Sequence, residues 1–209
     1  RRKKVRKHAT ALIERLLVEK PDYYLFPLQL DSDAQIRLHS PFAGVADAMR
    51  LVFESFARHA PPHTRLVVKE HPLDNGVRNW REEADSLAAL FGISERVDYI
   101  GWGDIVPVAA HSRGMVTINS TSGTLALALG VPVVVLGHAV YDIPDITYQN
   151  GLDAFWNDPV APDEDTFAAF RRVLIERCLI PGGFFSEEAL DKVVRHAVAR
   201  FEGRALLPE

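Results

Sequence analysis

Apolar residues follow two different spacings along this chain. Short runs of β-branched and aromatic residues alternate with longer stretches in which apolar residues recur every three or four positions. The first pattern is typical of buried strands and the second of amphipathic helices. Strands are predicted over 23–26, 66–68, 97–100, 115–118 and 131–136, and helices over 6–18, 45–59, 80–91, 163–178 and 186–203.

Strands that alternate with helices predict an α/β fold, a Rossmann-like parallel sheet flanked by helices on both faces. We expect residues 1–209 to form a single domain of this kind, with residues 1–20 as a linking helix. The segment 137–162 has little periodicity and is predicted to be a long ordered loop. The chain does not begin with Met, and we interpret it as part of a longer protein.

Composition excludes several classes of protein. The net charge of −4 gives no indication of nucleic-acid binding. Cys178 is the only cysteine, which excludes an internal disulfide and fits a cytoplasmic protein. The scattered histidines form no zinc motif, so we expect neither a metal nor a cofactor. Six of the first seven residues are basic, which indicates either a solvated helix face or contact with an anionic lipid.

Polar residues gather where the predicted strands end. Ligands of open parallel sheets bind at that edge, beyond the carboxyl ends of the strands. The residues at these strand ends are Gln29, Asp31, Lys69, Glu70, His71, Gly101, Trp102, Asn119, Ser120, Thr121, Ser122 and Gly123. Their position predicts one substrate-binding site shared by several strands.

The segment 119–123 indicates a site for an anion. A β-branched strand stops there at small hydroxyl residues and a glycine, and an Ala/Leu helix follows and ends at Gly130. Free amide groups and the positive end of the helix dipole favour a phosphate at such a turn. The hydroxyls of Ser120, Thr121 and Ser122 add donors. The alternative is an ordinary hydroxyl-rich helix cap.

A second cluster follows the strand at 66–68. Alternation places Lys69 and His71 on the same side of the strand and Glu70 on the other. Lys69 would bring a positive charge to a phosphate, and His71 would hydrogen-bond a phosphate oxygen or protonate a departing phosphate. Glu70 would orient a neighbour or bind a ribose hydroxyl. The alternative is structural, with His71 capping the strand and Lys69 paired with an acid.

The remaining candidates permit weaker predictions. Gly101 would let a nucleobase lie against the backbone with Trp102 beside it, although Trp102 would serve equally well as half-buried packing. Asp31 lies with Asp33 and Gln35 in a predicted loop, whose residues would pair as acid and base, hold a sugar or form a solvated turn. The chain lacks the Gly-x-Ser-x-Gly, Walker A and Gly-x-Gly-x-x-Gly motifs, which disfavours serine hydrolysis, nucleoside triphosphate hydrolysis and dinucleotide chemistry.

These residues resemble the capsular polysaccharide biosynthesis proteins of the KpsS/LipB type, retaining β-Kdo transferases of Gram-negative bacteria. The resemblance runs in order across nearly the whole chain. The segments that carry it are 27–29, 33–36, 69–74, 119–123, 137–144, 155–156 and 180–185. The His-Pro pair at His71 and the Ser/Thr segment are shared more loosely with bacterial sialyltransferases and teichoic-acid polymerases.

The resemblance implies one lobe of a GT-B glycosyltransferase that binds the nucleotide sugar CMP-Kdo. His71, Lys69, Ser120, Thr121 and Ser122 would hold its phosphate, with His71 as the catalytic residue. The implied acceptor is a lysophosphatidylglycerol-type lipid, which receives the first Kdo of a poly-Kdo linker. The family's acidic motif, expected to carry the nucleophile, lies in the N-terminal lobe and does not occur in these residues, so the fragment alone is expected to be inactive.

The same resemblance implies a cytoplasmic protein, peripheral on the inner face of the inner membrane, with capsule biosynthesis and export proteins as partners. Two alternatives stay open at this point. One is a related transferase lobe that uses CDP-glycerol or CMP-sialic acid. The other is a non-catalytic capsule-assembly module.

Overall fold

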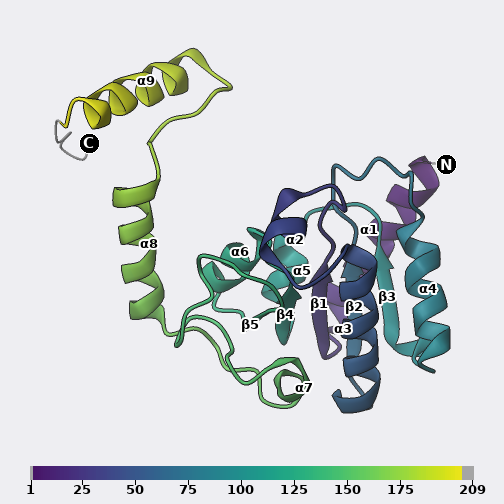
Figure 1. Cartoon of the computed structure of the whole chain (residues 1–209). Coiled ribbons are helices and arrows are strands. Elements are labelled where there is room, and N and C mark those ends of the chain that lie inside the picture. The colour runs from purple at the N-terminus through teal and green to yellow at the C-terminus, as the bar shows by residue number, and fades with distance from the viewer. Residues whose placement is uncertain (1, 204–209) are drawn as a thin grey trace. The chain divides into compact units, whose positions relative to one another are not determined.

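A five-stranded parallel sheet forms the centre of the fold (Figure 1). The computed structural model describes residues 2–203, with side chains from residue 5 onward. The strands are β1 (Tyr23–Pro27), β2 (Arg65–Lys69), β3 (Val97–Ile100), β4 (Gly114–Thr117) and β5 (Val133–Val135). Their spatial order is β3-β2-β1-β4-β5, which is a Rossmann-like order.

Strand β1 occupies the middle of this sheet. It pairs in parallel with β2 from Tyr23↔Arg65 to Pro27↔Lys69, and with β4 at Tyr24↔Gly114 and Leu25↔Met115. After β1 the chain passes first to β2 and β3 on one side of the sheet, and only then to β4 and β5 on the other side. At such a switch point the loops diverge and leave a crevice at the carboxyl edge of the sheet.

Helices cover both faces of the sheet, as the sequence predicts. One face carries α3 (Val45–His59), α4 (Trp80–Leu90) and α7 (Leu152–Phe155), and the other carries α1 (Arg2–Glu19), α5 (Val106–Ala110) and α6 (Ser122–Ala128). Two consecutive tyrosines show the alternation. The hydroxyl of Tyr23 donates to the carbonyl of Val108 in α5, on one face of the sheet. The hydroxyl of Tyr24 donates to the carbonyl of Trp156, just after α7, on the other face.

The described residues form two compact units, 2–164 and 165–203. The first unit holds the whole sheet. The second consists mainly of α8 (Glu164–Cys178) and α9 (Glu187–Phe201), whose N-cap Ser186 accepts the amide N–H of Ala189. A single domain over 1–209 stays a prediction. Within residues 2–203, no helix is both long and apolar enough to cross a bilayer.

Two short helices lie where the sequence predicts loops. Helix α2 (Ala34–His39) begins after Asp33, whose carboxylate accepts the amide N–H of Gln35. Helix α7 lies inside the segment 137–162 and places Phe155 and Trp156 in the core. A short 3₁₀ helix, η1 (Ser94–Arg96), also precedes β3. Helices this short carry too little periodicity to stand out from the sequence.

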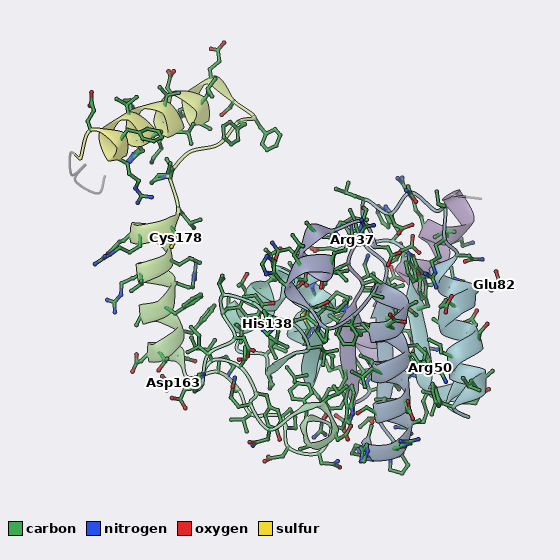
Figure 2. The ribbon with its side chains drawn as sticks, in the orientation of Figure 1. Arg37, Arg50, Glu82, His138, Asp163 and Cys178 are labelled. Atoms are coloured by element: carbon green, nitrogen blue, oxygen red, sulfur yellow. The ribbon has the colours of Figure 1, made fainter. Side chains whose placement is uncertain are left out.

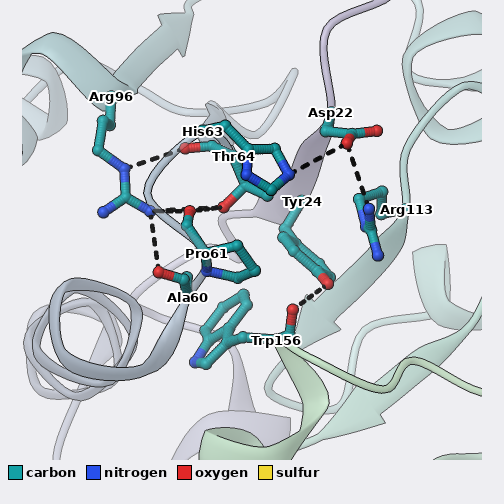
Figure 3. A network of polar contacts seen from close by, with 9 residues as sticks. All are labelled: Asp22, Tyr24, Ala60, Pro61, His63, Thr64, Arg96, Arg113 and Trp156. Atoms are coloured by element: carbon teal, nitrogen blue, oxygen red, sulfur yellow. Dashed lines mark hydrogen bonds and ion pairs between the residues drawn. The ribbon is translucent and has the colours of Figure 1, made fainter.

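A polar network ties the other edge of the sheet, where the strands begin (Figure 3). Arg113 donates to Asp22 at 3.2 Å, and His63 lies 3.4 Å from the same carboxylate. Arg96 donates to the carbonyls of Pro61 at 2.8 Å and Thr64 at 3.0 Å. These bonds join the turn after α3 to η1 and hold the strand starts together, away from the carboxyl edge.

We expect Arg96→Met to lower the free energy of unfolding by about 2 kcal/mol, because it leaves partly buried carbonyls without their charged donor. Urea denaturation measures the change. Arg58→Met is the matched control, since Arg58 is an exposed helix residue paired with Glu54, and it should cost about 0.5 kcal/mol or less. Equal losses in both variants would contradict a clamping role for Arg96.

Candidate functional site

A pocket of about 430 Å³ opens at the carboxyl edge of the sheet. It lies where the segments after β1, β2, β3 and β4 meet. The residues that line it are Pro27, Leu28, Lys69, Glu70, His71, Pro72, Gly103, Asp104, Ile105, Ser120, Thr121, Ser122 and Leu125. The structure therefore brings the Lys69–His71 cluster and the 120–122 turn to one pocket, on either side of the end of β1.

Lys69 supplies a buried positive charge to this pocket. Lys69 is only 4% exposed, and its ammonium donates to the carbonyl of Glu70 at 2.9 Å. Among the described residues, no carboxylate forms an ion pair with it. Burial lowers the pKa of Lys69, against the opposing effect of the Glu70 and Asp104 charges. An ammonium with spare donors and no counter-ion favours an incoming anion.

His71 is held in one tautomer by its own turn. Its Nδ1 accepts the amide N–H of Leu73 at 3.1 Å, so the proton of the neutral ring is on Nε2. Burial lowers the pKa of His71, Asp74 opposes that effect, and the Lys69 charge adds to it. At neutral pH the imidazole is therefore an uncharged N–H donor beside the pocket.

The hydroxyl turn differs from its prediction in one respect. The amide of Ser122 donates to Oγ of Ser120 at 3.1 Å, and the amide of Gly123 donates to the carbonyl of Ser120 at 3.0 Å. The hydroxyl of Ser122 also donates to Oγ of Ser120, at 2.8 Å. The amides of Ser122 and Gly123, expected to be free, are thus bonded within the turn, and α6 begins at Ser122. The donors left to the pocket are the Lys69 ammonium, the neutral His71 imidazole and hydroxyls of the turn, and the carboxylates Glu70 and Asp104 line it as well.

Gly123 and Tyr141 fix this turn from behind. The Tyr141 hydroxyl donates to the carbonyl of Ser120. A Cβ atom on Gly123 would lie 2.7 Å from Cζ of Tyr141, so the close approach requires glycine. Gly123 is therefore buried beneath the turn and supports the hydroxyl residues.

Gln29 and Asn119 bind each other. The Gln29 side-chain amide donates to Oδ1 of Asn119 at 2.9 Å, and its Oε1 accepts the amide N–H of Asn119 at 3.1 Å. The Asn119 side chain also donates to the carbonyls of Gln35 and His39. Both residues are buried, and neither lines the pocket. Their bonds join the ends of β1 and β4, and direct substrate contact by either stays a prediction.

Glu70, which follows β2, lines the pocket, whereas Gly101 and Trp102, which follow β3, do not. Glu70 lines it and accepts the Tyr99 hydroxyl at 2.6 Å. Gly101 lies beneath Val5 and Glu70, outside the lining. Trp102 is 46% exposed, and the Arg6 guanidinium lies 4.9 Å from its ring centroid. The predicted nucleobase contacts of Gly101 and Trp102 remain untested.

Asp31 lies in a different place from the other candidates. Its Oδ1 accepts the amide N–H of Val45 at 2.8 Å, at the start of α3, and it lines a second, smaller pocket. Of the expected site residues, six line the first pocket and Asp31 alone lines the second, whereas Gln29, Gly101, Trp102, Asn119 and Gly123 line neither. Sequence reasoning in turn missed Leu28, Asp104 and Ile105 as lining residues. The Asp104 carboxylate accepts the amide N–H of Val106, the first residue of α5.

Comparisons with known proteins agree on one family. Residues 2–185 match the family described as capsule polysaccharide biosynthesis protein. The chain is 40% identical over 166 residues to the capsule polysaccharide modification protein LipB of Neisseria meningitidis, covering 79% of the chain and 40% of that protein. It is 38% identical over 163 residues to the capsule polysaccharide export protein KpsS of Escherichia coli, covering 78% of the chain and 42% of that protein.

The solved structure of Thermosulfurimonas dismutans KpsC, a beta Kdo 2,7 transferase, shares the fold. It superposes with a TM-score of 0.51 at 21% identity, over 79% of this chain and 52% of that one. The chain spans about 40% of the length of the curated relatives it matches. On the match to residues 2–185 and the identity to LipB and KpsS, the chain belongs to the capsule polysaccharide biosynthesis protein family.

Proposed function

We propose that this chain is the donor-binding lobe of a GT-B glycosyltransferase that moves Kdo from CMP-Kdo to a lipid acceptor. The acceptor is of the lysophosphatidylglycerol type, and the transfer starts a poly-Kdo linker for the capsule. The chain acts at the inner face of the inner membrane with capsule biosynthesis and export proteins. Kinship with LipB and KpsS, and the fold shared with a Kdo transferase, support the reaction class.

The buried ammonium of Lys69 is the observation that carries this proposal. A lysine that is nine-tenths buried and lacks an acidic partner among residues 5–203 costs free energy in the empty pocket. An anion that enters the pocket removes that cost. His71 and the hydroxyls of Ser120 and Thr121 line the same pocket and offer further donors, whereas the Ser122 hydroxyl donates to Oγ of Ser120. A phosphate fits this set of groups better than a neutral ligand does.

The same groups suit the departure of CMP. As the sugar–phosphate bond breaks, negative charge grows on the phosphate, and donors aimed at it lower the barrier. Lys69 supplies charge in a poorly solvated place, where the attraction is stronger than in water. His71 supplies a neutral N–H from Nε2. Protonating its Nδ1 would break the bond from Leu73, so His71 stabilises the phosphate mainly by hydrogen bonding.

We expect Lys69→Met to raise the free energy of unfolding of the unliganded chain by about 1–3 kcal/mol at neutral pH, since it removes an unpaired buried charge. The folded chain releases the Lys69 proton at a lower pH than the unfolded chain, whose pKa is near 10.5. Wild-type stability therefore rises with pH up to about 10.5, and the advantage of the variant shrinks there.

Denaturation of both proteins between pH 7 and 10.5 measures this effect. Lys20→Met is the control, because Lys20 is exposed and follows the end of α1, near the start of β1. A Lys69→Met variant that is less stable than wild type at every pH would show that the ammonium has a structural partner.

CMP should bind the chain and raise its thermal midpoint. We expect Lys69→Met and His71→Ala each to weaken CMP binding about tenfold or more, since each removes a donor to a charged group. Isothermal titration gives the dissociation constants. The controls are Lys20→Met and His63→Ala, because His63 lies at the opposite edge of the sheet with Asp22.

A titration of the wild-type chain in which CMP neither binds nor shifts the melting temperature would count against the proposed function. Binding of CMP-Kdo, CMP-sialic acid and CDP-glycerol, compared in the same assay, identifies the donor. Tightest binding of CMP-Kdo agrees with the proposal, and tightest binding of either other nucleotide overturns the sugar assignment.

A further inference from the structure

Helix α1 runs between the two edges of the sheet, with its start beside the pocket. It ends at Glu19, shortly before β1 begins, so its first turns lie where the strands end. Ala9, Leu12 and Leu16 recur on one face of the helix and are buried, and the helix contacts β3 and α5. This packing holds the start of α1 against the segment 101–105, which follows β3.

Two glycines of this segment lie directly against α1. A Cβ atom on Gly103 would be 2.7 Å from Cδ1 of Ile13, and a Cβ atom on Gly101 would be 3.2 Å from Cγ1 of Val5. Side chains of α1 thus occupy the space that a side chain at either glycine would need. The close approach of the helix and the segment therefore depends on both partners.

Hydrogen bonds do not restrain residues 101–103. Among residues 5–203, neither their backbone nor their side chains form one. A segment with two glycines has much backbone freedom, so its order depends on packing. The Arg6 guanidinium, 4.9 Å from the ring centroid of Trp102, adds a cation–π contact from the same helix. Packing against α1 therefore supplies a restraint that hydrogen bonds do not.

The segment restrained in this way forms one wall of the first pocket. Gly103, Asp104 and Ile105 line that pocket, opposite none of which α1 itself contributes a lining residue. If the segment were free to move, a ligand would have to order it on binding, and that ordering costs free energy. The affinity of the pocket is thus linked to residues that do not touch the ligand.

We propose that α1 positions the 101–105 wall through Val5 and Ile13, and that the packing of α1 and ligand binding in the pocket stabilise each other. Val5 and Ile13 are positioning residues, since neither lines the pocket. The coupling is reciprocal, so a bound ligand also strengthens the packing of α1. A displacement of α1 would lower the affinity of the pocket with every lining residue unchanged. The ligand is the nucleotide of the proposed function, on which the coupling rests.

Order in the 101–105 segment is measured first without a ligand. In the 209-residue chain, the heteronuclear ¹H–¹⁵N NOE of its backbone amides reports fast local motion. We expect Ile13→Ala and Val5→Ala each to lower these NOE values. Val18→Ala is the matched control, because Val18 lies on the same helix, is 81% exposed and should leave the values unchanged. NOE values that stay at the wild-type level in either test variant overturn the role of that residue.

CMP affinity is measured next by isothermal titration, with each variant well below its melting temperature. Ile13→Ala should weaken CMP binding about fivefold or more, because binding must then order the wall. Val52→Ala is the control for lost stability alone. Val52 is buried on α3, the helix that carries Arg50 in Figure 2, on the face of the sheet opposite α1, and this variant should bind CMP like wild type.

Equal weakening in Ile13→Ala and Val52→Ala overturns the positioning role, and so does unchanged CMP affinity in Ile13→Ala. The two measurements also separate this inference from the proposed function. If CMP binds the wild type and Ile13→Ala changes neither order nor affinity, the inference fails and the donor proposal stands. If CMP does not bind the wild type, the donor proposal and the coupling to a nucleotide fail, and lower NOE values in Ile13→Ala then support the positioning of the wall alone.

Discussion

The position of β1 between β2 and β4 is the constraint on which the rest of this structure depends. Because all three strands run in parallel, their carboxyl ends lie at one edge. The bonds between Gln29 and Asn119 join two of these ends, and Lys69 closes the pairing of β1 with β2. Lys69 and Ser120, which follow different strands and are distant in the chain, thus line one pocket. Without this pairing, the Lys69–His71 cluster and the 120–122 turn would not line one pocket.

Much of the fold could be predicted from the sequence, because its longer elements carry clear periodicity. The helix over Val45–His59 and the strand over Val97–Ile100 have the predicted bounds. The parallel sheet with helices on both faces is confirmed. Helix α2 was missed because its start depends on one capping carboxylate, Asp33. The strand order also escapes local patterns, since it is decided by contacts between distant segments.

The position of the pocket was predictable, but the hydrogen bonds within it were less so. The predicted strand ends mark the edge at which the pocket lies, and Lys69, His71 and the 120–122 turn line it, whereas substrate binding there stays a prediction. The hydrogen-bond partners of these polar groups could not be predicted, because they depend on residues that only the fold brings close. The amides of Ser122 and Gly123 are taken by Ser120, and the Gln29 amide is taken by Asn119. Asp31 holds the start of α3 and faces another pocket.

The unpaired ammonium of Lys69 has a consequence for the lifetime of the protein. A ligand that binds only the folded state lowers the fraction of molecules that open, in proportion to its concentration over its dissociation constant. Proteases act on that open fraction. Under the proposed function, scarce nucleotide sugar would lead to faster degradation of the chain, and plentiful nucleotide sugar would let it accumulate. One buried side chain would thereby couple the abundance of the protein to the supply of the ligand that binds it.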